Sequence, residues 1–398
     1  MNMEYNRKDL VQKETKVMFP VGYHKFNEDQ RLNANLNMLY SMGIFSKEEL
    51  ADIGGRIESF EKWIEIFSAL GEEYEEKGEH LKAAFCYYSA MFYTSFAVQS
   101  GNGVLSKRDL YEKSRMMYDR YYSAFPELCF EYVPFQGGRL PVYYSVQENA
   151  KGTIIFHGGY DSIIQEFLCL YKYFRALGYD IYFYEGSGQG EVLMRSGIRM
   201  DAEWEHCTGA VLDHFGLNDV TIIGISLGGY LAPRAAAYDK RISRVVMCDL
   251  IYDFYGAIIN KFGDKGKYFD KLVSHPKNPV WRSVNKKLKQ NFFTNWLIDQ
   301  GYSVFEGVNT PCEYFEYIKR FNTRGISPML TQDVLVLAGA SDLYTVYYDE
   351  QIKALTNARS VTWRIFTEEE CADHHCQVGN IGLLLETITT WTEEKTNG

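Results

Sequence analysis

The segment Val220–Tyr230 constrains the fold more strongly than any other part of the chain. It begins as an apolar run rich in β-branched residues, typical of a buried strand, and is followed by the alanine-rich, helix-like stretch Leu231–Tyr238. Gly-Ile-Ser-Leu-Gly lies between the two, so the pattern Gly-x-Ser-x-Gly forms a strand-to-helix turn. Such a turn lifts the Ser226 hydroxyl above the sheet edge and places the Leu227 N–H at a helix N-terminus, where negative charge is stabilised. We therefore expect Ser226 to be a nucleophile rather than part of a purely structural glycine turn.

Length and composition favour one large α/β domain with an additional helical part. The chain has 398 residues, of which 46% are hydrophobic, enough for a full core. The net charge is −10 and the basic residues form no block beyond Lys286–Lys289, which argues against nucleic acid or an anionic membrane as a partner. Met1–Lys16 is polar and lacks the apolar core of a signal sequence, and no run approaches the ~18 apolar residues of a membrane span. We expect a cytoplasmic protein whose eight scattered cysteines are free thiols.

Residues 1–126 are expected to form an all-helical N-terminal cap domain. After an arm of about 27 residues, the sequence has helical spacing up to Phe125, with a capping box at Ser46–Glu49. Two segments, Phe60–Lys77 and His80–Ser100, match the spacing of a tetratricopeptide hairpin, but no second copy follows in register. We interpret them as an antiparallel helix pair within the cap, not as a peptide-binding array.

Residues 127–398 are expected to form an α/β domain. A β-hairpin over Cys129–Phe135 and Leu140–Val146 opens the sheet, and strands and helices then alternate. Alternation of this kind predicts a doubly wound, mainly parallel sheet that binds ligands at the carboxyl ends of its strands. Between about residues 250 and 329 the alternation breaks, which indicates a helical insertion before the last two strands. This insertion and the N-terminal helices are expected to cover the carboxyl ends.

A serine nucleophile needs a base, and the base needs a carboxylate to orient it. In chains with this kind of nucleophile turn, the order is serine, acid, histidine. Beyond Ser226 the histidines are His275, which precedes a proline in the insertion, and the pair His374–His375 in the loop after the final strand. Position favours the pair, and only one member can face the nucleophile because adjacent side chains point apart. Asp342 follows the penultimate strand and is the expected acid.

The loop after an early strand is expected to supply a second oxyanion donor besides Leu227. His157-Gly-Gly-Tyr160 follows an apolar strand, and His-Gly-Gly resembles the oxyanion loop of lipases and esterases. The N–H of Gly159 or of Tyr160 is the candidate. The next residues are expected to cap a helix over Ile163–Leu177, because Ser162 and Gln165 have the spacing of a capping box.

Several acidic residues are candidates for the rim of the pocket. Asp161 follows the oxyanion loop, Glu185 begins the glycine-rich turn Glu185–Gly190, and Asp249 and Asp253 come just after a strand. The glycine-rich turn lacks the third glycine of a dinucleotide fingerprint, so we expect it to border the site without binding a cofactor. Cys371, His374, His375 and Cys376 have no standard zinc spacing, and we expect no metal.

Five motifs carry a family resemblance: Gly158–Ser162, Glu185–Gly190, Gly224–Ala236, Leu337–Gly339 and His375–Asn380. Through them, residues 132–391 resemble the α/β-hydrolases with an N-terminal helical cap, the family of dihydropseudooxynicotine hydrolase and the FrsA-like esterases. The resemblance places the family's serine, acid and histidine on Ser226, Asp342 and His375. It implies an α/β-hydrolase fold, no cofactor, a homodimer by analogy, and either esterase chemistry or cleavage of a C–C bond next to a ketone.

The resemblance has two departures around the acid and the base. Relatives often have Gly-Glu-x-Asp-His-Phe where this chain has Gly339-Ala-Ser-Asp-Leu-Tyr344, and His374 replaces a residue that is often acidic. The surroundings of the acid and the base therefore differ, so the resemblance does not predict the substrate or the pH optimum.

The sequence leaves the reaction itself open. The leading hypothesis is a serine hydrolase that attacks an ester or amide carbonyl of a small, aromatic or apolar molecule. The same residues would serve a C–C bond hydrolase acting on a β-diketone-like substrate, which would need an additional acid in the cap or near Asp253 to protonate the carbanion leaving group. The sequence is also compatible with an acyltransferase, and with a binding protein that has the same fold but no activity.

Overall fold

The computed structural model describes residues 19–397, so Met1–Lys16 and most of the expected N-terminal arm lie outside the described residues. Within this range one sheet of eight strands has the order β1-β2-β4-β3-β5-β6-β7-β8. The pairs β1–β2 and β2–β4 are antiparallel, and all other neighbours are parallel. The expected mainly parallel sheet, entered through a β-hairpin, is confirmed. The strands are β1 Cys129–Phe135, β2 Gly138–Ser145, β3 Gly152–His157, β4 Tyr179–Tyr184, β5 Val220–Ile225, β6 Ile242–Cys248, β7 Asp333–Gly339 and β8 Ser360–Phe366.

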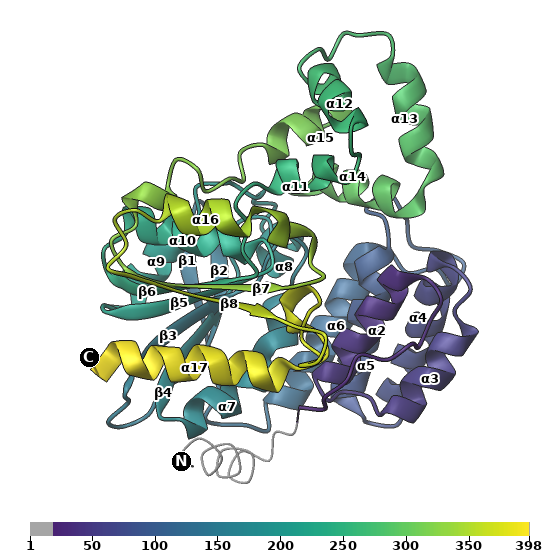
Figure 1. The fold of residues 1–398 in the computed structure, drawn as a ribbon. Helices are drawn as coiled ribbons and strands as arrows, with labels where there is room; N and C mark the ends of the chain where they lie inside the picture. The colour runs from purple at the N-terminus through teal and green to yellow at the C-terminus, as the bar shows by residue number, and fades with distance from the viewer. Residues whose placement is uncertain (1–18, 398) are drawn as a thin grey trace.

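Helices cover both faces of this sheet, as Figure 1 shows. One face carries α9, α10 and α16, and the other carries α7 and α17. Every residue of β5 and β7 is buried. Because helices cover both faces of the sheet, both faces of these strands are apolar, and their sequences are continuous apolar runs. The helical segments of this part are η1 Ile164–Leu170, α7 Tyr171–Ala176, α8 Gly190–Met194, α9 Glu205–Phe215, α10 Gly228–Tyr238, η2 Ser327–Met329, η3 Leu343–Tyr347, α16 Tyr348–Ala354, η4 His375–Gln377 and α17 Ile381–Asn397.

The helix expected over Ile163–Leu177 is a 3-10 turn, η1, that continues into the short helix α7. The expected capping box is absent, because Ile163 occupies the N-cap position and no side chain caps η1. The Ser162 hydroxyl instead accepts a hydrogen bond from the Gly159 N–H at 3.1 Å. Ser162 thus fixes the loop after β3 and does not start a helix.

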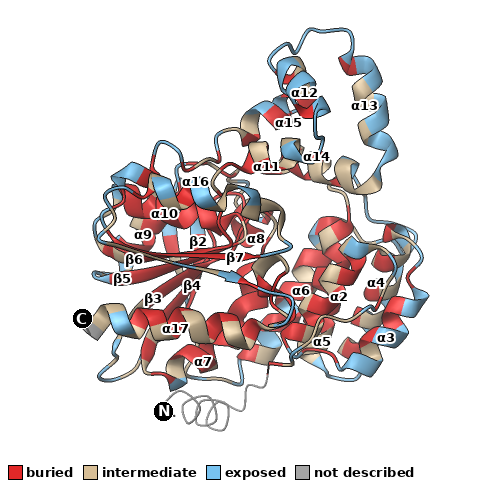
Figure 2. Ribbon diagram, in the orientation of Figure 1, coloured by how far each residue is buried: buried red, intermediate tan, exposed pale blue. Residues whose placement is uncertain are grey.

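The N-terminal helices pack as one group beside the sheet (Figure 1). The expected capping box at the start of α3 is present, between Ser46 and Glu49. The inward faces of these helices are buried, as Figure 2 shows. None of the helices in residues 19–397 combines the length and the apolar character that a bilayer span requires. The N-terminal helices are α2 Gln30–Ser41, α3 Lys47–Arg56, α4 Phe60–Glu76, α5 His80–Tyr93 and α6 Lys107–Tyr122.

A buried ion-pair network joins α6 to the α/β part. Glu191 on α8 is fully buried and forms an ion pair with Arg115 of α6. Arg139 and Arg195 add contacts at 3.5 and 3.3 Å, and the Tyr132 hydroxyl donates to the same carboxylate at 2.7 Å. A buried carboxylate with this many donors is electrostatically compensated, so it fixes the helices against the sheet.

The insertion before the last two strands forms a lobe that projects from the α/β part and meets the N-terminal helices (Figure 1). The contact is largely aromatic: Phe292 stacks on Phe60 with ring centroids 4.3 Å apart, and the Trp296 indole N–H donates to the Phe92 carbonyl at 2.8 Å. The two helical parts therefore meet directly. The insertion helices are α11 Phe254–Asn260, α12 Lys265–Val273, α13 Trp281–Gln290, α14 Phe292–Val304 and α15 Pro311–Ile318.

Candidate active site

Ser226 occupies the sharp turn between β5 and α10. Its φ is +60°, in the left-handed region that non-glycine residues rarely adopt. The turn is tight because its glycines permit close approach: a Cβ added at Gly224 would lie 2.1 Å from the Gly228 carbonyl oxygen. The turn is also tied to the neighbouring strand, because the Ser226 N–H donates to the Cys248 carbonyl at 2.6 Å. The Ser226 side chain is held at the sheet edge in a conformation that the surrounding backbone imposes.

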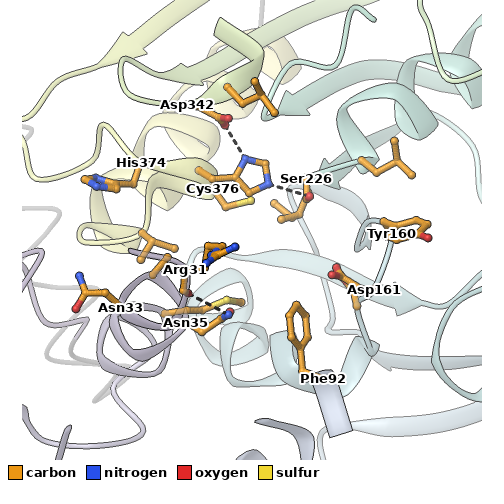
Figure 3. Close-up of a pocket in the computed structure, with 18 of the residues that line it drawn as sticks. Arg31, Asn33, Asn35, Phe92, Tyr160, Asp161, Ser226, Asp342, His374 and Cys376 are labelled. Carbon is orange, nitrogen blue, oxygen red and sulfur yellow. Dashed lines mark hydrogen bonds and ion pairs between the residues drawn. The ribbon is translucent and has the colours of Figure 1, made fainter. Parts of the chain in front are cut away.

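His375 and Asp342 complete a hydrogen-bonded chain with Ser226, drawn in Figure 3. His375 Nε2 lies 2.9 Å from Ser226 Oγ, and His375 Nδ1 lies 2.6 Å from Asp342 Oδ2. His374 faces elsewhere: its ring stacks on Tyr23 with centroids 3.6 Å apart, and its Nδ1 lies 3.1 Å from Asp373. Of the two adjacent histidines, the structure brings only His375 to Ser226.

A second carboxylate, Asp249, also faces His375. Its Oδ2 lies 3.0 Å from His375 Nδ1, and the residue is fully buried. The Cys376 N–H and the Gln377 side-chain amide donate to it at 2.5 and 2.6 Å. Sequence reasoning placed Asp249 only near the pocket and missed this contact. The available signal was its position directly after β6, which pairs with β5, the strand that leads to Ser226.

Both carboxylates raise the pKa of His375, but their own pKa values are shifted in opposite directions. Burial disfavours charge on His375, but the Asp342 and Asp249 carboxylates overcome it and raise the pKa of His375 well above its ordinary value. Burial and the neighbouring Asp342 charge raise the pKa of Asp249 to about 7. Burial also opposes ionisation of Asp342, yet contact with His375 holds the pKa of Asp342 well below its ordinary range. Asp342 is therefore ionised at neutral pH, whereas Asp249 is partly protonated there.

The loop after β3 packs directly against the turn that holds Ser226. A Cβ added at Gly159 would lie 2.7 Å from the Leu227 nitrogen and 2.9 Å from the Ser226 Cβ. Within residues 19–397, the N–H groups of Leu227 and Tyr160 have no hydrogen-bond acceptor, whereas the Gly159 N–H donates to Ser162. Of the two sequence candidates for the second oxyanion donor, Tyr160 is the one whose N–H is free.

A cavity of about 1340 Å³ lies over these residues, between the α/β part, the N-terminal helices and the insertion. Ser226, Leu227 and His375 line one side, and Arg31, Asn33 and Asn35 of α2 line another (Figure 3). Most of the wall is aromatic or aliphatic. The aromatic residues that line it are Tyr23, Trp63, Phe85, Tyr88, Phe92, Tyr93, Phe156, Tyr160, Phe167, Phe254, Phe262, Phe293, Trp296, Phe315 and Tyr344.

Of the four acidic residues expected at the pocket rim, only Asp161 lines this cavity, and Asp249 lies behind His375. The expectation is wrong for Glu185 and Asp253, because backbone N–H groups hold their carboxylates elsewhere. Glu185 accepts from the N–H groups of Ile164 and Glu191 at 2.9 and 2.6 Å. Asp253 caps α11 through the Gly256 N–H at 2.8 Å, and it pairs with the Arg324 side chain at 2.6 Å.

One cluster in the site has the residue types of a metal centre. Asp249, His375 and Cys376 offer donor atoms that lie within 4.8 Å of one another. However, the His375 nitrogens already contact Ser226 on one side and two carboxylates on the other. Binding of a metal by His375 would break one of these contacts, so the arrangement favours proton transfer over metal ligation.

No family model matches the sequence. The protein named hydrolase acrC from Aspergillus aculeatus is 30% identical over 225 residues, which cover 50% of this chain and 48% of acrC. The chain thus matches about half the length of that relative. The protein named hydrolyase poxO from Penicillium oxalicum is 25% identical over 426 aligned residues, which cover 94% of this chain and 99% of poxO.

Two solved structures have similar folds across most of the chain. The 2,6-dihydroxy-pseudo-oxynicotine hydrolase superimposes with a TM-score of 0.63 at 18% identity, covering 91% of this chain and 95% of that one. AbyA5 superimposes with a TM-score of 0.63 at 16% identity, covering 88% and 90%. At such identities the likeness concerns the fold, and the sequence relatives are named hydrolases. The chain therefore has an α/β-hydrolase fold, and the curated proteins that it resembles in sequence are named as hydrolases.

Proposed function

We propose that the protein is a serine hydrolase in which Ser226, His375 and Asp342 form a catalytic triad. The observation that carries the proposal is the continuous chain of hydrogen bonds from Ser226 Oγ through His375 to Asp342 at the wall of the cavity. His375 Nε2 accepts the Ser226 proton while Oγ attacks a carbonyl carbon, and Asp342 holds the ring and stabilises the imidazolium.

The free N–H groups of Leu227 and Tyr160 form the oxyanion hole in this scheme. They lie on two loops that pack against each other beside Ser226, so both are fixed before the substrate binds. Preorganised donors of this kind stabilise the tetrahedral intermediate because they need no reorganisation when charge develops. Water then releases the acyl group, with His375 acting again as the base.

The cavity indicates the size and the polarity of the substrate. Pockets for drug-sized ligands commonly measure about 300 to 1000 Å³, and this one exceeds that range at about 1340 Å³. Its wall is mainly aromatic and aliphatic, with polar groups close to Ser226 and on α2. We therefore propose a mainly apolar substrate, at or above the size of a drug molecule, that carries a carbonyl group.

Labelling with a fluorophosphonate tests the nucleophile directly. Wild-type protein should be labelled and should hydrolyse p-nitrophenyl esters, with longer acyl chains preferred because the cavity is large and apolar. Ser226→Ala should abolish labelling and lower kcat by a factor on the order of 10⁵ while the protein stays folded. Ser283→Ala, on the insertion helix α13 and away from the cavity, is the matched control and should keep both properties. Labelling that persists in Ser226→Ala would refute the proposal.

A second candidate, cleavage of a C–C bond next to a ketone, is favoured by one specific observation. Such a reaction needs an acid that protonates the carbon leaving group, and an acidic side chain besides the triad lies in the cavity. Asp161 is such a side chain, and Glu28 and Glu166 line the cavity too, whereas the sequence had suggested an acid in the cap or near Asp253.

A further inference from the structure

Positive charge is concentrated in one part of the insertion. Residues 261–289, here called the basic patch, hold nine lysines and arginines and two aspartates, a net charge of +7. The whole chain has a net charge of −10, so the remaining residues carry −17. The net charge that argued against an anionic membrane is therefore an average over two regions of opposite sign. The basic residues of the patch are Lys261, Lys265, Lys267, Lys271, Lys277, Arg282, Lys286, Lys287 and Lys289.

The positive charge of the patch is not neutralised within the protein. All nine basic side chains are exposed, and none of them forms an ion pair with a residue between 19 and 397. Of the two aspartates, Asp270 is engaged outside the patch: it accepts from the Tyr255 hydroxyl at 2.9 Å and pairs with Lys319 at 3.3 Å. The patch thus presents uncompensated charge to its surroundings.

The patch lies on the projecting part of the insertion. Figure 1 shows α12 and α13 in the lobe that stands away from the sheet, and Figure 2 shows that α13 and the loop before it are largely exposed. Trp281 at the start of α13 is buried, whereas the basic residues that follow it on this helix are exposed. Salt screens exposed charges over about 8 Å under physiological conditions. A projecting lobe can therefore bind an anionic surface although the rest of the protein is acidic.

Exposed apolar side chains lie among the lysines. Tyr268 is 78% exposed, more than any other large apolar side chain in residues 19–397, and Val280 and Phe262 are 51% and 41% exposed. Phe262 and its neighbour Lys261 also line the cavity over Ser226. Because Phe262 is both exposed and part of the cavity wall, the patch extends to the opening of the cavity.

We propose that the basic patch docks the enzyme on an anionic lipid bilayer, and that an apolar substrate passes from the bilayer into the cavity beside Phe262. Lysines next to exposed aromatic residues are typical of protein surfaces that bind at the interface of anionic membranes. The second half of the inference rests on the proposed serine hydrolase and names the source of its substrate. The docking itself requires no catalytic activity.

The kind of basic residue favours a bilayer over an acidic protein. The patch has eight lysines and one arginine, whereas protein interfaces are enriched in arginine and depleted in lysine. Lysine is a flexible point charge without the bidentate geometry of arginine. Such charges suit a fluid surface, where many anionic headgroups offer attraction but no fixed pattern. The exposed apolar side chains favour a bilayer over nucleic acid, because they can enter the headgroup region.

Sedimentation with lipid vesicles tests the docking directly. Wild-type protein should bind vesicles of phosphatidylcholine and phosphatidylglycerol in equal parts but not vesicles of phosphatidylcholine alone. Binding should be lost as the salt concentration rises from about 0.1 M to about 1 M. The variant with Lys286→Gln, Lys287→Gln and Lys289→Gln should bind about 100-fold more weakly, because each basic residue near an anionic surface contributes a factor of about five.

The matched control makes the same change in net charge elsewhere. Lys47 on α3, Lys240 after α10 and Lys353 on α16 are exposed and lie outside the insertion. The variant in which all three are replaced by Gln should bind the anionic vesicles as the wild type does. Circular dichroism shows that both triple variants fold.

Two esters test the passage of the substrate. p-Nitrophenyl palmitate is supplied within the anionic vesicles, and p-nitrophenyl butyrate is supplied in solution. The variant of the three α13 lysines should hydrolyse the palmitate more slowly in proportion to its loss of binding, and it should hydrolyse the butyrate at the wild-type rate. Palmitate hydrolysis that stays at the wild-type rate while vesicle binding is lost would overturn the passage from the bilayer.

The outcomes separate the docking from the catalytic mechanism. The docking is overturned if the wild type hydrolyses the butyrate but does not bind anionic vesicles, or if the two triple variants lose binding equally. Retention on heparin-agarose without vesicle binding would assign the patch to a soluble polyanion and would also overturn it. Vesicle binding without fluorophosphonate labelling or ester turnover would instead refute the serine mechanism and support the docking.

Discussion

Replacing Asp249 with Asn should shift the pH dependence of the enzyme to lower pH. In the proposed mechanism His375 must be neutral to accept the Ser226 proton, so kcat/KM should rise with pH through the pKa of His375 in the free enzyme. The carboxylates of Asp342 and Asp249 raise that pKa against the effect of burial. Removal of one of them lowers the pKa, and the acidic limb of the profile moves to lower pH.

The structure sets the magnitude. Two full charges 3.0 Å apart, the distance from Asp249 Oδ2 to His375 Nδ1, interact by about 5 kcal/mol at an effective dielectric constant of about 20. This is an upper limit, because the pKa of Asp249 is raised to about 7 and the group carries only part of a charge near neutral pH. A shift of about 1 to 3 pH units is therefore expected, in the range that a neighbouring opposite charge produces.

The assay is the hydrolysis of p-nitrophenyl butyrate by wild type and Asp249→Asn from about pH 4 to 10, followed at a wavelength where the product's absorbance does not depend on its ionisation. At high pH the variant should retain much of its activity, because Asp342 still orients His375. Asp342→Asn should instead lose about 10⁴-fold in kcat, the usual cost of removing the orienting acid. An acidic limb that stays in place or moves to higher pH in Asp249→Asn would refute the reasoning.

Two further predictions concern stability. Trp296 lies at the contact between the insertion and the N-terminal helices, and its side chain is only 5% exposed. Trp296→Ala should therefore lower the free energy of unfolding, measured in urea, by about 3 to 5 kcal/mol. A loss below about 1 kcal/mol would show that this contact does not hold the two parts together. Glu191→Gln should cost about 3 to 5 kcal/mol because the buried Arg115 then has only the half-exposed Asp119 as a counter-charge. Burial opposes ionisation of Glu191, but Arg115 lowers its pKa, so its contribution is present above the unfolded pKa and is lost as pH falls through the folded one. The difference in unfolding free energy between wild type and variant should therefore shrink in acid, and a difference that stays the same from neutral pH into acid would contradict this.

Local patterns in the sequence were sufficient for most of the α/β part. The nucleophile turn at Ser226, the β-hairpin and the alternation of strands and helices each have a short-range signal, and the sheet follows from them. Asp342 and His375 could be expected near Ser226 because the carboxyl ends of β5 and β7 lie at one edge of the sheet, where the loop after β8 also begins.

Contacts that depend on exact loop paths could not be predicted. Asp249 and His375 are 126 residues apart, and their contact arises only because the loop after β8 folds back over the end of β6. Likewise, the sequence around Ser162 is typical of a helix cap and that around Glu185 of a pocket rim. In the folded protein, however, Ser162 accepts a hydrogen bond from the Gly159 N–H and Glu185 from the Ile164 N–H. The residue types alone do not predict which backbone N–H such a side chain will bond.

The contact between the first helices and the insertion has a consequence for synthesis of the protein. The partners Phe92 and Trp296 are 204 residues apart, as are Ser95 and Asp299. At about 5 to 20 residues per second on the ribosome, roughly 10 to 40 seconds pass between the emergence of the two sides. During this interval the aromatic faces of α4 and α5 lack their covering helix, so the nascent chain is open to aggregation and is a natural client for chaperones that shield apolar surface.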